Sequence, residues 1–204
     1  MTDLSIEQLI TNLRDKASKN EDEFINEYEN NKDIIENALL LREYYADITQ
    51  IISVYAHFLY LKSRFEKAFP YVERAIKLWE GKPELWGKPL AQISYYEMLH
   101  FERAVANYNL GHINDSYKDI KALVQKDPQN TIYKNWFRGI QKRRLRYITA
   151  TLGIIGLACL LPKLLHMHGP VADLSETGFR ISFCLAIAME IYLYFSNPST
   201  NQNN

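Results

Sequence analysis

The sequence predicts an all-α protein with two parts, a helical domain over residues 1–146 and an apolar helical hairpin over residues 147–195. Three observations predict this fold class. Apolar residues of the first part recur at helical spacing. No segment alternates with the period of a strand, and no Asn-Gly or Asp-Gly turn occurs. Two nearly uncharged apolar segments, 147–165 and 179–195, follow each other near the C-terminus.

The first helix is marked at its start and along one face. Ser5 and Gln8 have the spacing of a capping box, in which each side chain bonds to the backbone N–H of the other residue. The predicted helix continues to Ala17, and its apolar stripe consists of Ile6, Leu9, Ile10 and Leu13.

The next two helices are predicted over residues 21–28 and from Asp33 past Tyr45. The second of these follows a helical spacing of apolar residues. They are Ile34, Ile35, Ala38 and Leu39.

Residues 63–75 and 111–123 have the same pattern of residue types. Each segment begins with a small residue, Ser63 or Gly111, and continues with apolar and small residues in the same order. A further small residue, Ala56 or Ala104, precedes each start by seven positions. Small residues let two helices cross closely, and the large residues then fill the space between hairpins.

This pattern resembles the turn and second helix of a tetratricopeptide repeat (TPR). The resemblance covers residues 49–82 and 97–130 and implies a TPR-like stack of helical hairpins of the α-solenoid type. Residues 131–146 would form the capping helix of the stack and could continue into the first apolar segment. Its apolar face would consist of Ile132, Trp136, Phe137 and Ile140.

The match departs from the family in three respects. The copies lie 48 residues apart rather than the 34 of the family, so residues 83–96 form an insertion or a lengthened helix. Leu123 stands where a small residue is usual, and Ile52 and His100 stand where a large aromatic residue is usual. A helical bundle without repeats is the alternative.

The two apolar segments are long enough for short membrane spans, which need about 17 to 25 residues. Basic residues precede the first segment, and such residues mark the cytoplasmic side of a span. We therefore expect a cytoplasmic helical domain, a loop 166–178 on the other side, and a disordered tail 196–204. The bacterial inner membrane is favoured over an organelle membrane, and a buried hairpin in a soluble protein is the alternative. The membrane-flanking basic residues are Lys142, Arg143, Arg144 and Arg146.

Glu190 lies inside the second apolar segment, where a carboxyl group is energetically costly. It shares a helix face with Ser182 and Ala186, and small residues also form a face of the first segment. Such faces allow membrane helices to approach closely. Glu190 is therefore either part of a polar oligomerisation or ion-path site, or close enough to the cytoplasmic interface to reach water.

No catalytic motif is present: there is no phosphate-binding glycine loop, no HExxH and no Gly-x-Ser-x-Gly. His166 and His168 supply only two of the three or four ligands that a metal site needs. The chain is neutral overall, with ten acidic and four basic residues in 1–38 and six basic residues in 134–146. A basic segment beside apolar helices does not indicate nucleic-acid binding. We expect no enzymatic activity, no metal and no cofactor.

TPR domains bind peptides along the concave face formed by the first helix of each repeat. The resemblance therefore implies partner-binding residues on the first helix of each copy. They are Gln50, Ser53, His57, Tyr60, Met98, Phe101, Val105, Tyr108 and Asn109. The expected partner is a cytosolic protein or peptide, and several of these residues could instead pack internally.

Two functions are compatible with this sequence. The first is a membrane-anchored adaptor that recruits a cytosolic protein through its helical groove. The second is a membrane effector or channel-like subunit whose apolar hairpin forms a homo-oligomer and perturbs the bilayer under control of the helical domain.

Overall fold

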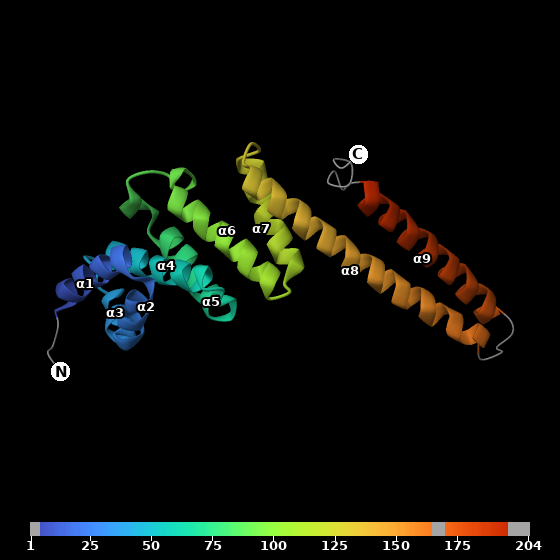
Figure 1. Ribbon diagram of the computed structural model, residues 1–204, viewed down its shortest axis with the longest axis horizontal. Coiled ribbons are helices and arrows are strands. Elements are labelled where there is room, and N and C mark those ends of the chain that lie inside the picture. The colour runs from blue at the N-terminus through green and yellow to red at the C-terminus, as the bar shows by residue number, and fades with distance from the viewer. Residues whose placement is uncertain (1–4, 165–169, 196–204) are drawn as a thin grey trace. The chain divides into compact units, whose positions relative to one another are not determined.

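The computed structural model describes residues 5–164 and 170–195, with side chains at 5–159, 176–189 and 191. All the regular elements in this part of the chain are helical, so the predicted all-α class is confirmed (Figure 1). They are α1 (Ile6–Lys19), α2 (Glu21–Asn30), α3 (Lys32–Ala38), α4 (Tyr45–Leu61), α5 (Phe65–Gly81), the short 3-10 helices η1 (Pro83–Trp86) and η2 (Leu90–Gln92), α6 (Ser94–Asn109), α7 (Ile113–Lys126), α8 (Thr131–Leu164) and α9 (Pro170–Phe195).

The chain divides into two compact units, Met1–Lys134 and Asn135–Asn204. The sequence placed the boundary after residue 146. The difference arises because α8 runs without interruption from Thr131 to Leu164, through the position where composition changes. A change in composition therefore does not coincide with the end of the first packed unit.

The start of the chain follows its local signals closely. The Ser5 hydroxyl accepts a hydrogen bond from the Gln8 N–H at 3.3 Å, and the Gln8 side chain accepts one from the Ser5 N–H at 3.1 Å. This is the capping box that the sequence predicts. Three residues of the predicted stripe are buried: Leu9, Ile10 and Leu13.

The predicted third helix is wrong, because the chain turns between Ala38 and Tyr45 instead of continuing as one helix. The apolar spacing continues through the turn, and Leu40 is left 85% exposed. The turn allows α3 and α4 to contact α1 as separate helices. Tertiary packing thus overrides local helix propensity here.

Helices α4–α7 form two consecutive hairpins. Helix α4 packs on α5, α5 on α6 and α6 on α7, while α4 also contacts α6. The earlier helices α1 and α2 both contact α4 and extend the packing toward the N-terminus. Each hairpin therefore packs mainly on its neighbours along the chain.

The two hairpin turns have the same backbone geometry. Ser63 and Gly111 both have positive φ angles, 57° and 85°. The next residue in each turn, Arg64 or His112, donates its N–H to the carbonyl five positions earlier, at 3.0 and 2.8 Å. This bonding is typical of a helix end closed by a left-handed residue. The 48-residue internal repeat is therefore present in the backbone as well as in the residue types.

The repeat extends to the buried small and apolar residues. Paired positions 48 residues apart have completely buried side chains. The pairs are Ala56 with Ala104, Ala68 with Ser116, and Val72 with Ile120.

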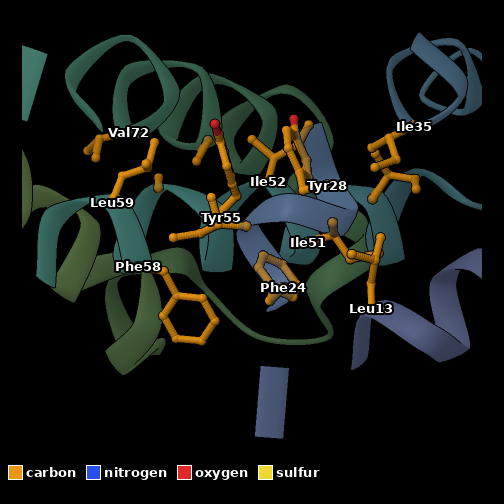
Figure 2. Close-up of a cluster of buried hydrophobic side chains, with 14 of the residues drawn as sticks. Leu13, Phe24, Tyr28, Ile35, Ile51, Ile52, Tyr55, Phe58, Leu59 and Val72 are labelled. Atoms are coloured by element: carbon orange, nitrogen blue, oxygen red, sulfur yellow. The ribbon is translucent and has the colours of Figure 1, made fainter. Parts of the chain in front are cut away.

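A core of apolar side chains joins α1–α5 (Figure 2). Phe24 meets Phe58 edge to face, with ring centroids 5.2 Å apart. Leu13 and Ile52 are completely buried in the same cluster. Burying each such side chain contributes about 1.5–3 kcal/mol, so this cluster is the main stabilising feature of the first unit.

Residues 83–96 prove to be an insertion rather than a lengthened helix. The 3-10 helices η1 and η2 lie within residues 83–93, and only the last three residues, 94–96, belong to α6. Trp86 stacks on Trp79 with centroids 3.9 Å apart and donates its indole N–H to the Trp79 carbonyl at 2.8 Å. Gly87 ends η1 with a φ of 66°, a conformation that favours glycine.

The second unit contains most of α8 and all of α9. The predicted loop 166–178 is wrong from residue 170 onward, because α9 begins at Pro170. Proline is favoured in the first turn of a helix, and an ion pair of 2.6 Å between Glu176 and Arg180 supports the next turns. Residues 165–169 lie outside the described part of the chain.

Helices α8 and α9 approach closely at small residues. A Cβ at Gly156 would lie 3.6 Å from the Phe179 ring and from Ser182. Both Gly156 and Ser182 belong to the small-residue faces noted in the sequence. Large apolar side chains elsewhere on the hairpin are exposed. They are Ile148, Ile154, Ile155, Leu157, Ile181, Phe183, Leu185, Ile187 and Ile191.

Within the described residues, no helix has both the length and the apolar character required to cross a membrane. The side chains of residues 160–165, which end the first predicted span, and of Glu190 lie outside that description, as does the tail 196–204.

Candidate functional site

The residues predicted to bind a partner separate into a buried group and an accessible group. Ser53 is completely buried, and its hydroxyl accepts the indole N–H of Trp79 at 3.1 Å. Val105 is 3% exposed. These two residues belong to the core and cannot contact a partner.

The other predicted residues are at least partly accessible. Gln50 and Asn109 are exposed, and the Asn109 amide donates to the Val105 carbonyl at 2.8 Å. The other members are half-buried: His57, Tyr60, Met98, Phe101 and Tyr108. Phe101 packs against Tyr133 at the start of α8, with ring centroids 5.4 Å apart.

His57 forms a pair that the sequence did not predict. Its Nδ1 contacts the carboxylate of Glu102, which comes from α6 and is 1% exposed. The two residues are 45 positions apart, so helical spacing along one segment could not reveal them. Burial raises the pKa of Glu102 above its usual value, and the contact with His57 partly offsets this effect.

Two tyrosines lie close to the same carboxylate. Burial, and then the charge of Glu102, raise the pKa values of Tyr60 and Tyr95. The second carboxylate oxygen of Glu102 and the Tyr95 hydroxyl are buried and have no hydrogen-bond partner in the structure. This polar cluster joins α4 to α6.

A more accessible site follows from comparing the two copies of the repeat. In the first copy, three tyrosine rings fill the space over the middle of α4. Tyr55 stacks on Tyr28 of α2 with centroids 3.9 Å apart, and meets Tyr71 of α5 edge to face at 4.8 Å. The three rings close the seam where α2 and α5 meet over α4. Figure 2 shows two of them, Tyr28 and Tyr55.

In the second copy, charged residues occupy the equivalent positions. Arg103 corresponds to Tyr55 and Asp119 to Tyr71, and their side chains form a two-pronged ion pair with bonds of 3.0 and 2.7 Å. Glu73 of α5 lies 3.6 Å from the Arg103 guanidinium. The seam between α5 and α7 is therefore polar, whereas its counterpart in the first copy is aromatic.

The seam is also open. Two pockets adjoin each other there and share Arg103 and Asp119. The first, of about 340 Å³, lies between α6 and α7, and the second, of about 440 Å³, lies among α5, α6 and α7. We call the two pockets together the α6 groove. Its lining residues are Phe69, Glu73, Ala91, Tyr96, Glu97, His100, Arg103, Asn107, His112, Asp115, Lys118, Asp119, Ala122, Leu123 and Lys126.

The charges in the α6 groove are held in defined states. Burial, followed by the charge of Arg103, lowers the pKa of His100, which favours a neutral imidazole at neutral pH. Burial acts against the charge of Arg103, but the bonds to Asp119 outweigh it and raise the pKa of the guanidinium. Burial alone would raise the pKa of Glu97, yet the Lys126 and Tyr133 hydrogen bonds bring it below its usual value.

The α6 groove has features of a ligand-binding site. Arg103, Glu97 and Lys126 are all engaged in ion pairs, so none of them is a poised acid or base. In the part of the chain that the structure describes, no three His, Cys, Asp or Glu side chains are grouped to hold a metal ion. A concave pocket with apolar walls and a few fixed polar groups is typical of ligand-binding sites.

The groove lies on the face of α6 opposite the residues predicted to bind a partner. The sequence does contain a signal for it: when the two copies are aligned, His100, Arg103 and Asn107 match Ile52, Tyr55 and Leu59. Polar residues at positions that are apolar in a related copy indicate a different environment.

The four basic residues that the sequence predicts to flank a membrane all lie on α8. Lys142, Arg143 and Arg144 are half-buried and Arg146 is exposed. The Arg143 guanidinium lies 6.0 Å from the centre of the Tyr147 ring.

Comparison with known proteins gives no relative: no family model, no curated protein and no solved structure matches the chain.

Proposed function

We propose that this protein is a membrane-anchored adaptor whose TPR-like helical repeats hold a segment of a partner protein in the α6 groove. The observation that carries the proposal is the open, polar seam around Arg103 at positions that stacked tyrosines fill in the first copy. Aromatic side chains fill this seam in the first copy, while the second copy has an open space there. The difference favours the second copy as the binding site.

The dimensions of the groove favour a peptide segment. Tyr96 and Asn107 lie 11 positions apart on α6, so the groove follows the helix for about 16 Å at the helical rise of ~1.5 Å per residue. An extended chain covers that distance in roughly five residues. Both polar and apolar side chains line the groove, as recognition of a peptide requires.

The repeat geometry supports the TPR-like assignment. Two hairpins share their turn conformation and their buried small residues, and the first helices of the two copies touch. Stacked hairpins of this kind provide extended binding surfaces along their length.

Membrane attachment is supported by the second unit. Its hairpin exposes many large apolar side chains, and exposed apolar areas of this kind mark interaction or membrane surfaces. The basic residues 142–146 precede this surface along α8. Such residues favour the cytoplasmic side of a bilayer.

Photo-crosslinking in native membranes tests the proposal. A photoreactive amino acid replaces Ala122, which is exposed at the edge of the groove, or Gln125, which is exposed on the same helix but does not line the groove. We expect a partner adduct from position 122, none from 125, and loss of the adduct when Arg103→Tyr and Asp119→Tyr close the groove. Equal adducts from both positions, or an adduct that survives closure, would refute the proposal.

A further inference from the structure

We infer that the α6 groove selects a peptide segment with one large apolar side chain and one Lys or Arg two or three positions away. The inference rests on the proposed adaptor function and names the chemistry of the partner.

The apolar requirement comes from the pocket between α6 and α7. Its walls include Tyr96, Ala122 and Leu123, and its volume of about 340 Å³ admits one large side chain. His100 meets the Tyr96 ring edge to face, with centroids 4.6 Å apart. Its Nδ1 lies 3.4 Å from the Arg103 guanidinium, which can only donate, so the imidazole proton is on Nε2. A neutral imidazole is compatible with an apolar guest.

The basic requirement comes from the charges of the neighbouring pocket. Three carboxylates line it, those of Glu73, Asp115 and Asp119, against two cations, Arg103 and Lys118. Arg103 and Lys118 each pair with an aspartate, at 2.7 and 3.1 Å. Glu73 makes the longest of these contacts, 3.6 Å to Arg103. The net negative charge is therefore centred on Glu73, where a guest cation would find a carboxylate.

The spacing of the two features follows from the length of α6 between the pockets. His100 lines the first pocket and Asn107 the second. The two pockets are therefore separated by about 10 Å along the helix. About three extended residues cover this distance. The long side chain of Lys or Arg can span part of it, which also allows a separation of two residues. An acidic guest is disfavoured because Arg103, at the junction of the pockets, is already neutralised by Asp119.

Selection from a random 12-residue peptide phage library, panned on the full-length chain in detergent micelles, tests the inference. We expect enriched peptides to share a large apolar residue two or three positions from Lys or Arg. Two variants probe the two pockets on a synthetic copy of the most enriched peptide. Ala122→Trp fills the apolar pocket and should weaken binding more than roughly tenfold. Glu73→Gln removes one charge and should weaken binding roughly threefold to tenfold, and only for peptides with the basic residue.

Gln125→Trp is the matched control, because it introduces the same side chain on α7 away from the groove, and circular dichroism verifies that each variant is folded. Enriched peptides without a basic residue, or peptides that bind Ala122→Trp unchanged, overturn the inference. If the peptides that overturn the inference lose binding when Tyr108 or Gln50 is changed, they bind outside the α6 groove. The protein would then still be an adaptor, with a different binding surface. If no peptide is enriched, the inference and the adaptor function both fail.

Discussion

At the scale of single residues, the two copies of the repeat differ at the left-handed position of the hairpin turn, which is Ser63 in the first copy. Its φ of 57° lies in the left-handed region, while the equivalent position in the second copy is Gly111. A residue with a Cβ pays about 1–2 kcal/mol for this conformation, and glycine does not. The first hairpin therefore retains a small local strain that the second hairpin lacks.

Ser63→Gly should stabilise the protein by roughly 0.5–1 kcal/mol, because relief of the strain exceeds the greater backbone freedom of glycine in the unfolded chain. Ser18→Gly, in the exposed last turn of α1, is the control and should destabilise the protein. Thermal unfolding followed by circular dichroism measures both effects. A lower midpoint for Ser63→Gly would contradict the strain argument.

The buried carboxyl group of Glu102 should make the stability of the protein depend on pH. Its pKa in the folded state is raised above the unfolded value by burial. The folded state therefore binds its proton more tightly, so the stability that this group contributes is complete below the unfolded pKa and is lost as pH rises through the folded pKa. His57, Tyr60 and Tyr95 are the titratable groups that interact with it.

Glu102→Gln removes that loss, since the amide stays neutral. The midpoint of the variant relative to the natural chain should therefore rise as the pH increases from 5 to 8. Thermal unfolding at several pH values measures the difference. A difference that shrinks over this range would show that ionised Glu102 is stabilised in the folded protein by its contact with His57.

At the scale of elements, the seam between α5, α6 and α7 depends on one cation. Arg103 holds Asp119, whose side chain is 15% exposed, and reaches toward Glu73. Removing one partner of a buried ion pair costs about 3–5 kcal/mol, and less where water has access. The same seam in the first copy needs no charge, because aromatic rings fill it.

Arg103→Ala should cost roughly 2–3 kcal/mol, because Asp119 loses its partner in a poorly hydrated place. The double change Arg103→Tyr and Asp119→Tyr, which copies Tyr55 and Tyr71, should recover most of that loss through ring packing. Chemical denaturation of the single and double variants gives the comparison. A double variant as unstable as Arg103→Ala would mean that the two seams are not equivalent.

Helix boundaries were predictable where a local signal exists and not elsewhere. The capping box at Ser5 and the small residue at the helix end, Gly111, are such signals, and a boundary lies at each of them. The turn between α3 and α4 has none, because Leu39–Leu41 favour a helix as strongly as their neighbours do. The start of α9 at Pro170 was missed because residues 170–178 are largely polar, so they were assigned to the loop and the second apolar segment was predicted to begin at Phe179.

At the scale of the whole molecule, the two compact units correspond to two proposed roles. The first unit, Met1–Lys134, contains the α6 groove, and the second, Asn135–Asn204, contains the apolar hairpin. A unit with its own core is expected to fold when it is separated from the other.

A fragment of residues 1–134 should unfold cooperatively and remain in the supernatant after alkaline carbonate extraction of membranes. The full chain should stay in the membrane pellet, because the exposed apolar side chains of α8 and α9 need a non-aqueous environment. Immunoblotting of both fractions gives the result. Release of the full chain by carbonate would exclude anchoring by the hairpin.

The helical class, the cap of α1, the 48-residue repeat and the apolar character of the last quarter all follow from residue types and their spacing within short segments. The contact of Glu102 with His57, the burial of Ser53 and Val105, and the opening of the second seam do not. Those outcomes depend on which helix faces come together, and that is set by the packing of side chains distant in sequence.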